Sequence, residues 1–374
     1  MAKSENSYLT EMENFFRMAA KYGASDLHLK AAASPYLRMD GTVRSLDTET
    51  LTGDKIKELV YSLLSDNQIE TFEATGNLDL AYSVAGVGRF RVNLFKQRGS
   101  VSAAMRRVNV EIPNFADINL PTETMERISS FREGLVIVSG ITGSGKSTTL
   151  AAMINHINTH RKCHVVTIED PIEYLYKDEM AFINQREIGI DVESFTSALK
   201  YVVRQDPDVI LIGELRDEES FQVALSASET GHLVLGTLHS SSCAQTFGRI
   251  LDLFPAGRQD QIRQGLQFNL KAILCQRLMP AKKKEMKLVP AVEVLISNPI
   301  LRKIIKDKED TKISDVIRGG AEDGMQDFTQ SLCGLVKGEL VEKKVAMSFA
   351  PNPQALQMLL QGIVVDEGRT IVGG

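Results

Sequence analysis

Residues 135–150 read LVIVSGITGSGKSTTL, and the prediction of the fold starts from them. An apolar run passes into the glycine-rich segment GITGSGKS, residues 140–147, and then into residues that suit a helix. Strand, glycine loop and helix in this order form a P-loop. The glycines permit a tight turn whose backbone N–H groups point inward, and the helix start adds partial positive charge. The stretch therefore predicts a site for a polyphosphate.

Two side chains of this loop have expected roles. Lys146 would reach the β- and γ-phosphates, and Ser147 would supply a hydroxyl to Mg²⁺, a hard cation that prefers oxygen ligands. A glycine-rich turn that precedes a helix by chance is the alternative, and the strand and helix flanks argue against it. The sequence holds no NKxD motif, so a guanine-specific site is not expected. We predict ATP and Mg²⁺ as cofactors, with the nucleotide bound by Gly140, Thr142, Gly143, Ser144, Gly145, Lys146, Ser147 and Thr148.

Length and composition limit the class of protein. With 374 residues, of which 43% are apolar, the chain can form two or three domains. A net charge of −5 argues against nucleic acid as a partner, because phosphate neutralisation needs clustered Lys and Arg. The four cysteines lie far apart, which argues against a disulfide framework and a structural zinc site. Since no run of about eighteen apolar residues occurs, we expect a soluble, cytoplasmic protein.

Two further apolar runs end in acidic residues. VVTI is followed by EDPIE at residues 169–173, and DVILIG is followed by Glu214. Ligands of open α/β sheets bind at the carboxyl ends of the strands. We expect Glu169 and Glu173 to position a water molecule, and Glu214 to hold Mg²⁺ or to polarise the nucleophile. The alternative for residues 169–173 is an acidic helix start.

Two histidines flank another apolar run, LVL at residues 233–235. His232 precedes the run and His239 follows it. An imidazole can report whether a γ-phosphate is present, so both are candidate sensors; packing at a strand end is the alternative. The succession of strand, P-loop, helix and further strands ended by polar groups predicts a mostly parallel sheet covered by helices, as in a RecA-like core.

The N-terminal part of the chain follows another pattern. An amphipathic helix that ends near Gly23 is followed by β-rich segments. In the hairpin at residues 88–106, apolar and polar side chains alternate, so one face carries several arginines, among them Arg91 and Arg106. Two interpretations stay open: a solvated outer face, or guanidinium groups that reach a phosphate across a subunit boundary. Residues 110–121 contain two prolines and no period, which predicts a linker.

The C-terminal part contains apolar residues at helical and strand spacings. The positions 262, 266, 270, 273 and 274 predict one amphipathic helix. Residues 288–296 predict a strand, and residues 300–306 and 315–345 predict helices.

Together the motifs resemble one family, the PilT/PilU-like ATPases that retract type IV pili, within the class of secretion and pilus motors. The matching segments are GASDLHL (23–29), GRFRVN (88–93), GSGKSTTLAAM (143–153), TIEDPIEY (167–174), DPDVILIGELRD (206–217) and TGHLVLGTLHS (230–240). The resemblance implies roles within a site: a catalytic glutamate (Glu173), a Walker B glutamate (Glu214), a His-box pair (His232 and His239) and arginines that act across subunits (Arg91 and Arg106).

The resemblance also implies an organisation and partners. It implies a PAS-like α+β domain at 1–109, a linker at 110–121, a RecA-like ATPase core at 122–290 and a mostly helical region at 291–374. It implies a homohexameric motor that drives pilus retraction and twitching motility at the inner membrane. The expected partners are an inner-membrane pilus platform protein and a paralogous retraction ATPase.

Two departures bear on the direction of pilus movement. The four-cysteine metal motif common in assembly motors is absent, which favours retraction. Residues 300–307, ILRKIIKD, keep only the pattern of the AIRNLIRE-like segment usual in retraction motors. The alternatives are a pilus-assembly or type II secretion motor and a non-hydrolysing nucleotide-binding ring.

Overall fold

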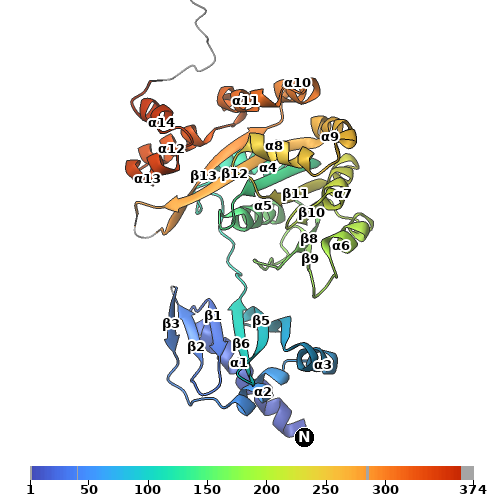
Figure 1. Cartoon of the computed structure of the whole chain (residues 1–374), viewed down its shortest axis with the longest axis vertical. Helices are drawn as coiled ribbons and strands as arrows, with labels where there is room; N and C mark the ends of the chain where they lie inside the picture. Colours follow the sequence, from blue (N-terminus) through green and yellow to red (C-terminus); the bar gives the residue numbers. More distant parts are fainter. Residues whose placement is uncertain (1, 40, 284–285, 364–374) are drawn as a thin grey trace, which may run out of the picture. The chain divides into compact units, whose positions relative to one another are not determined.

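This structure is a computed structural model that describes residues 2–39, 41–283 and 286–363 (Figure 1). The chain divides into two compact units. The first comprises residues 1–111 together with 173–175, and the second comprises residues 112–172 and 176–374. None of the helices within the described ranges has both the length and the apolar character needed to cross a bilayer.

The first unit is a six-stranded antiparallel sheet with the order β3-β2-β1-β6-β5-β4. Its strands are β1 (Asp26–Leu29), β2 (Tyr36–Met39), β3 (Thr42–Ser45), β4 (Asn77–Val84), β5 (Gly88–Gln97) and β6 (Ser100–Arg107). Its helices are α1 (Ala2–Lys21), α2 (Gly53–Tyr61) and α3 (Asp66–Thr75). The amphipathic helix predicted to end near Gly23 is confirmed as α1.

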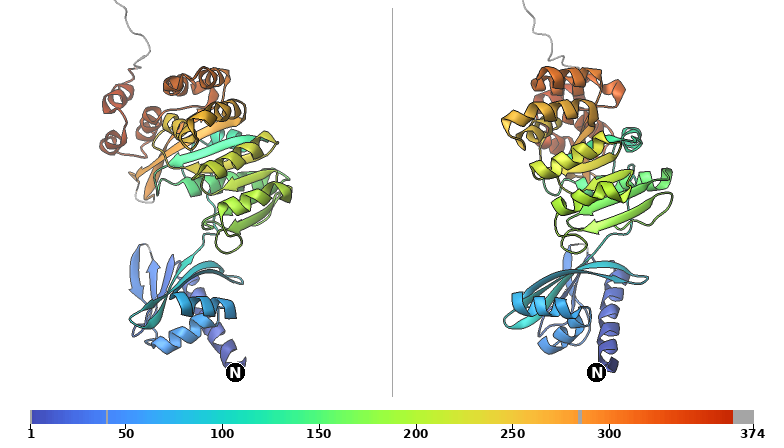
Figure 2. Two further views of the ribbon diagram at one scale, coloured as in Figure 1. Left: turned by 45° about the vertical axis from the view of Figure 1, so that its right-hand side comes forward. Right: turned by 90° about the vertical axis from the view of Figure 1, so that its right-hand side faces the viewer.

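Alternation along the strands sends apolar side chains to one face of this sheet, where the helices pack (Figure 2). Phe90 and Val92 of β5 are buried there, and the Phe16 ring of α1 lies 4.4 Å from the Phe90 ring, centroid to centroid. Residues at the intervening positions, such as Arg91, point to the opposite face because successive side chains of a strand alternate. The helices thus leave the polar face of the sheet uncovered.

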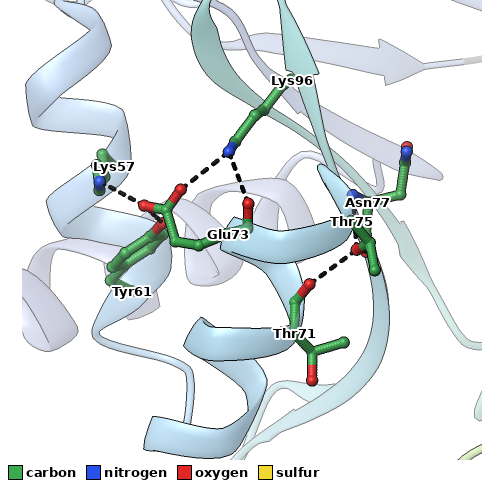
Figure 3. A network of polar contacts seen from close by, with 7 residues as sticks. All are labelled: Lys57, Tyr61, Thr71, Glu73, Thr75, Asn77 and Lys96. Atoms are coloured by element: carbon green, nitrogen blue, oxygen red, sulfur yellow. Dashed lines mark hydrogen bonds and ion pairs between the residues drawn. The ribbon is translucent and has the colours of Figure 1, made fainter.

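A polar network around Glu73 fastens α3 to α2 and β5 (Figure 3). The Glu73 carboxylate accepts hydrogen bonds from Lys57 at 2.6 Å, Tyr61 at 2.6 Å and Lys96 at 2.9 Å. These contacts lower the pKa of Glu73 to about 2, and the hydrogen bond from Lys57 has the largest effect. The carboxylate therefore stays ionised over the physiological pH range, and the network holds three elements together.

The second unit contains a seven-stranded sheet with the order β13-β12-β7-β11-β10-β8-β9. Six strands are parallel, and β13 at one edge runs antiparallel to β12. The strands are β7 (Gly134–Gly140), β8 (His164–Glu169), β9 (Phe182–Glu187), β10 (Val209–Ile212), β11 (Leu233–Leu238), β12 (Leu270–Pro280) and β13 (Leu288–Ile296). The predicted mostly parallel α/β sheet is confirmed, and its central strands are buried apolar runs as parallel strands require.

Helices surround this sheet. Those within the sheet-forming part are α4 (Thr122–Ser129), α5 (Lys146–His160), α6 (Phe195–Val202), α7 (Glu218–Glu229), α8 (Cys243–Asp252) and α9 (Ala256–Asn269). Those after β13 are α10 (Pro299–Asp307), α11 (Ile313–Gly319), α12 (Phe328–Lys337), α13 (Lys343–Phe349) and α14 (Pro353–Leu360). The segment predicted as helical from 315 to 345 contains α11 to α13, interrupted at glycines such as Gly324 and Gly338.

The helix predicted across positions 262 to 274 is wrong in its second half. Ile262 and Leu266 lie on α9, but Leu270, Ile273 and Leu274 belong to β12. This strand pairs with β7 on one side and β13 on the other, and these three residues are buried. A short apolar run buried on both faces shows no period that separates helix from strand, so only the pairing decides.

Candidate nucleotide-binding site

The P-loop joins β7 to α5, and its first glycine lies against the neighbouring strand. Gly140 has a φ of +148°, and a Cβ placed on it would lie 2.7 Å from the carbonyl oxygen of Gln276 on β12. Because this contact is with backbone, a side chain here would displace the strand. Gly145, which directly precedes α5, has a φ of +92°. The glycines at both ends of the turn are therefore required by its geometry.

The Lys146 ammonium group lies inside the loop. Its Nζ donates hydrogen bonds to the carbonyl oxygens of Gly140 at 2.9 Å and Ile141 at 3.1 Å. Burial lowers the pKa of Lys146, and the nearby Glu214 carboxylate opposes this shift. The cation is thus held by backbone oxygens that phosphate oxygens can replace.

Other predicted nucleotide-binding residues surround Lys146. The Ser144 hydroxyl is buried and makes no hydrogen bond to the rest of the described chain. Thr142, Gly143 and Ser147 are exposed, and Ser147 lies in the first turn of α5. A helix N-terminus with an unused hydroxyl, an exposed hydroxyl and a cation fits a polyphosphate with its metal ion.

Glu214 and His239 come together at the carboxyl ends of β10 and β11. The Glu214 carboxylate lies 3.3 Å from His239 Nε2 through one oxygen and 2.7 Å from an Arg216 guanidinium nitrogen through the other. The hydrogen bond and charge of Glu214 raise the pKa of Arg216. Since β7, β10 and β11 are parallel, this cluster lies at the same edge of the sheet as the P-loop.

Glu169 and Glu173 have different surroundings. Glu169 is buried, and one of its carboxylate oxygens accepts hydrogen bonds from Thr167 at 2.6 Å and Gln185 at 3.2 Å. The contact with Gln185 joins β8 to β9. Glu173 is exposed and groups with the first unit, where its carbonyl oxygen accepts a hydrogen bond from the Asn109 amide at 3.3 Å. The Glu169 carboxylate thus contacts the sheet itself, whereas the Glu173 side chain faces solvent.

His232 does not join His239. It precedes β11, at the opposite end from His239, and its Nδ1 lies 2.9 Å from the carbonyl oxygen of Ala227 at the end of α7. Six strand residues separate the two histidines, a span of roughly 20 Å at the rise of an extended chain. The histidines thus lie at the two ends of one strand, as the sequence predicts, and the strand places His239 beside Glu214. A role for His232 stays a prediction.

Arg91 and Arg106 are register partners on β5 and β6 of the first unit. The Arg106 Nε donates to Asp26 at 2.9 Å, and Arg38 lies 3.7 Å from the same carboxylate. Burial would raise the pKa of Asp26, but hydrogen bonds from Ser25 and Arg106 outweigh it, so the pKa is lowered. The polar face of this sheet thus carries a row of arginines around one ionised, buried carboxylate.

Comparison with known proteins shows which family this chain resembles. A family model described as type II/IV secretion system protein matches residues 2–320. The chain belongs to this family. It is 39% identical to the type IV pilus retraction ATPase PilT of Pseudomonas aeruginosa, with 92% of this chain and 99% of that protein covered. It is 36% identical to the type IV pilus ATPase PilU of the same organism, with 94% and 91% covered.

A solved structure of the pilus retraction motor PilT with bound ADP has a TM-score of 0.84 to this chain at 42% identity. It covers 92% of this chain, and this chain covers 98% of it. The resemblance to PilT/PilU-like ATPases predicted from the sequence is therefore confirmed, as are the α/β fold and the assignment to the ATPases.

Two side chains of this chain lie beside the site and have no role predicted from the sequence. Arg216 stands two positions after Glu214 and carries no role predicted from the sequence, although its guanidinium contacts the Glu214 carboxylate. Gln276 is buried on β12 opposite Gly140, and its Nε2 donates to the Thr149 hydroxyl of α5 at 2.9 Å. The available signal was a glutamine inside the apolar run of residues 272–279, because a buried amide needs a partner.

Proposed function

We propose that this chain is an ATP-hydrolysing motor that powers the retraction of type IV pili and so twitching motility. The observation that carries the proposal is the arrangement of Lys146, Glu214 and His239 at one edge of a parallel sheet. Phosphoryl transfer needs a cation, an acidic group and a polar sensor arranged around the terminal phosphate. The assignment to pilus retraction rests on the similarity to PilT, which is described as a type IV pilus retraction ATPase.

The positions of the loop residues support the following roles. The phosphates of ATP bind against the N–H groups of residues 140–148, and Lys146 exchanges its two backbone partners for phosphate oxygens. Ser147 and Glu214 would hold Mg²⁺, which would supply charge stabilisation for phosphoryl transfer. His239 senses the γ-phosphate through its contact with Glu214.

Catalysis requires further groups. Glu173 orients the attacking water and accepts its proton. Glu169 contributes by keeping β8 and β9 together rather than by contact with the nucleotide. Arg91 and Arg106 stabilise the developing charge in the site of a neighbouring subunit, as arginine fingers do.

Such cross-subunit completion requires a closed head-to-tail assembly, and we propose a homohexameric ring. In this proposal the PAS-like domain of residues 1–109 and the RecA-like core of residues 122–290 flank the linker at 110–121, and residues 291–374 form the helical C-terminal region. The ring acts on a pilus platform protein at the cytoplasmic side of the inner membrane, alongside a paralogous retraction ATPase, and nucleic acid is no partner.

A steady-state phosphate-release assay tests the enzyme. Lys146→Ala and Glu173→Ala should each lower turnover at least about 100-fold, because charge stabilisation and positioning of the water supply most of the rate. Lys162→Ala, which removes an exposed lysine of the same unit, is the matched control and should turn over like the wild type. Wild-type rates in both site variants would exclude the proposed mechanism.

A deletion strain tests the direction of movement. A retraction motor is not needed to assemble the fibre, so cells without this chain should keep pili and lose twitching. Loss of the pili themselves would favour the assembly motor over the retraction motor.

A further inference from the structure

The loop between β11 and α8, residues 239–242, begins with His239 and is anchored by the β12–β13 hairpin. The Cys275 thiol of β12 donates to the Ser240 carbonyl oxygen at 3.7 Å. The buried Glu293 carboxylate of β13 accepts a hydrogen bond from the backbone N–H of Cys243 at 2.5 Å, where α8 begins. Both ends of the loop are therefore tied to a strand pair far away in the sequence.

Arg277 of β12 holds the middle of this loop and reaches the C-terminal helices as well. One guanidinium nitrogen donates to the Ser241 carbonyl oxygen at 2.9 Å, and another donates to the Phe349 carbonyl oxygen, at the end of α13, at 3.0 Å. The guanidinium carbon lies 4.2 Å from the centroid of the Phe328 ring on α12. A planar group with several donors can make all three contacts, whereas a lysine ammonium cannot.

We propose that Arg277 is a positioning residue that sets the geometry of the His239 loop and couples it to α12 and α13. The inference rests on the proposed function, because it assumes that His239 acts during ATP turnover. Ser241 is two residues from His239, so a displacement of the Ser241 backbone moves the imidazole relative to Glu214. Displacements of about 1 Å at positioning groups can lower rates by about 100-fold.

If Arg277 had only a structural role, its removal would destabilise the fold, but the surroundings of Ser241 argue against this. Ser241 is exposed, so water can solvate its carbonyl oxygen once the guanidinium is lost. The loop also keeps its contacts with Cys275 and Glu293. Removal of the Arg277 side chain should therefore leave the fold and the P-loop intact and affect the catalytic step.

The test is ATP turnover of the full-length chain with the variants Arg277→Ala, Arg277→Lys and His239→Ala, and with the double variant Arg277→Ala/His239→Ala. Arg277→Ala should lower kcat about tenfold with KM for ATP within about twofold of the wild type, a loss equal to about one positioning hydrogen bond. Arg277→Lys should recover little of this loss. The matched control is Arg132→Ala, which removes an exposed arginine of the same unit and should leave kcat at the wild-type value.

The double variant separates positioning from general stabilisation. If Arg277 acts through His239, Arg277→Ala should cause no further loss in the His239→Ala background. The same fold loss in both backgrounds, or a wild-type kcat for Arg277→Ala, would overturn the inference. A wild-type kcat for His239→Ala would remove the proposed sensor and this inference together, while the ATPase proposal would still be judged by Lys146→Ala.

Phe328→Leu tests the coupling to α12 without touching the loop. Leucine keeps an apolar side chain but removes the ring face under the guanidinium, so kcat should fall about two- to threefold. In the Arg277→Ala background the same change should have no effect on kcat. An equal loss in both backgrounds would show that α12 acts by another route and would overturn the coupling. Should Arg277→Ala fail to fold, Arg277→Lys and Phe328→Leu carry the same test.

Discussion

Two alanine substitutions in the P-loop, Gly140→Ala and Gly143→Ala, compare the destabilisation caused by a steric contact with that caused by backbone strain alone. Gly140 and Gly143 both have positive φ, +148° and +75°. A Cβ on Gly143 meets nothing within 4 Å, whereas one on Gly140 lies 2.7 Å from the Gln276 carbonyl oxygen and also meets the Ser144 side chain. We predict that Gly140→Ala is much the more destabilising of the two.

The magnitudes follow from these contacts. Gly143→Ala should cost about 1–2 kcal/mol, the penalty for a side chain in the left-handed region. Gly140→Ala adds overpacking of about 1–3 kcal/mol to a backbone strain of about 1–3 kcal/mol, a total of roughly 2–6 kcal/mol. At about 2–4 °C per kcal/mol for a unit of this size, the Tm should fall by about 5 °C (range about 2–8 °C) for Gly143→Ala and by about 12 °C (range about 4–24 °C) for Gly140→Ala.

Thermal unfolding followed by calorimetry measures both variants. The transition of the P-loop unit is identified in the wild type because a bound nucleotide analogue raises its Tm. Equal Tm shifts for the two variants would refute the steric argument, since only at Gly140 does a close Cβ contact add to the backbone strain. A wild-type Tm for Gly140→Ala would refute the close contact between the loop and β12.

Further predictions concern the buried polar groups and the metal ion. Because the folded pKa of Asp26 lies below its usual value of 3.8, the carboxylate stabilises the fold above that pH and ceases to do so as the pH falls through the folded pKa. Urea unfolding of Asp26→Asn should therefore lack the part of the acid-dependent loss of stability that begins near pH 4 in the wild type; an unchanged pH profile would contradict this. Gln276→Leu leaves the buried Thr149 hydroxyl without its partner and should cost about 1–3 kcal/mol in chemical denaturation. Gln276→Leu/Thr149→Val should recover most of that loss, and a double variant as unstable as the sum of the single variants would argue against the pair. Chelation of divalent cations should stop ATP turnover and added Mg²⁺ should restore it, as a phosphate-release assay would show.

The sequence alone determined the parts of this protein that depend on local pattern. The P-loop could be predicted because three closely spaced glycines between an apolar run and a helix permit a tight turn, which is a local feature of the sequence. The acid at Glu214 and the histidine at His239 could be assigned to one edge of the sheet, since the carboxyl ends of parallel strands meet there. The resemblance carried by the six motifs extended this prediction to the family.

The tertiary structure decided what depends on residues far apart in the chain. Positions 270–274 form a strand because β7 and β13 pair with them, which their apolar spacing could not reveal. The contacts of Arg277 with Ser241 and Phe349 cross 36 and 72 positions of sequence. A local pattern fixes the period of side chains along an element, but only strand pairing and helix packing determine which elements meet.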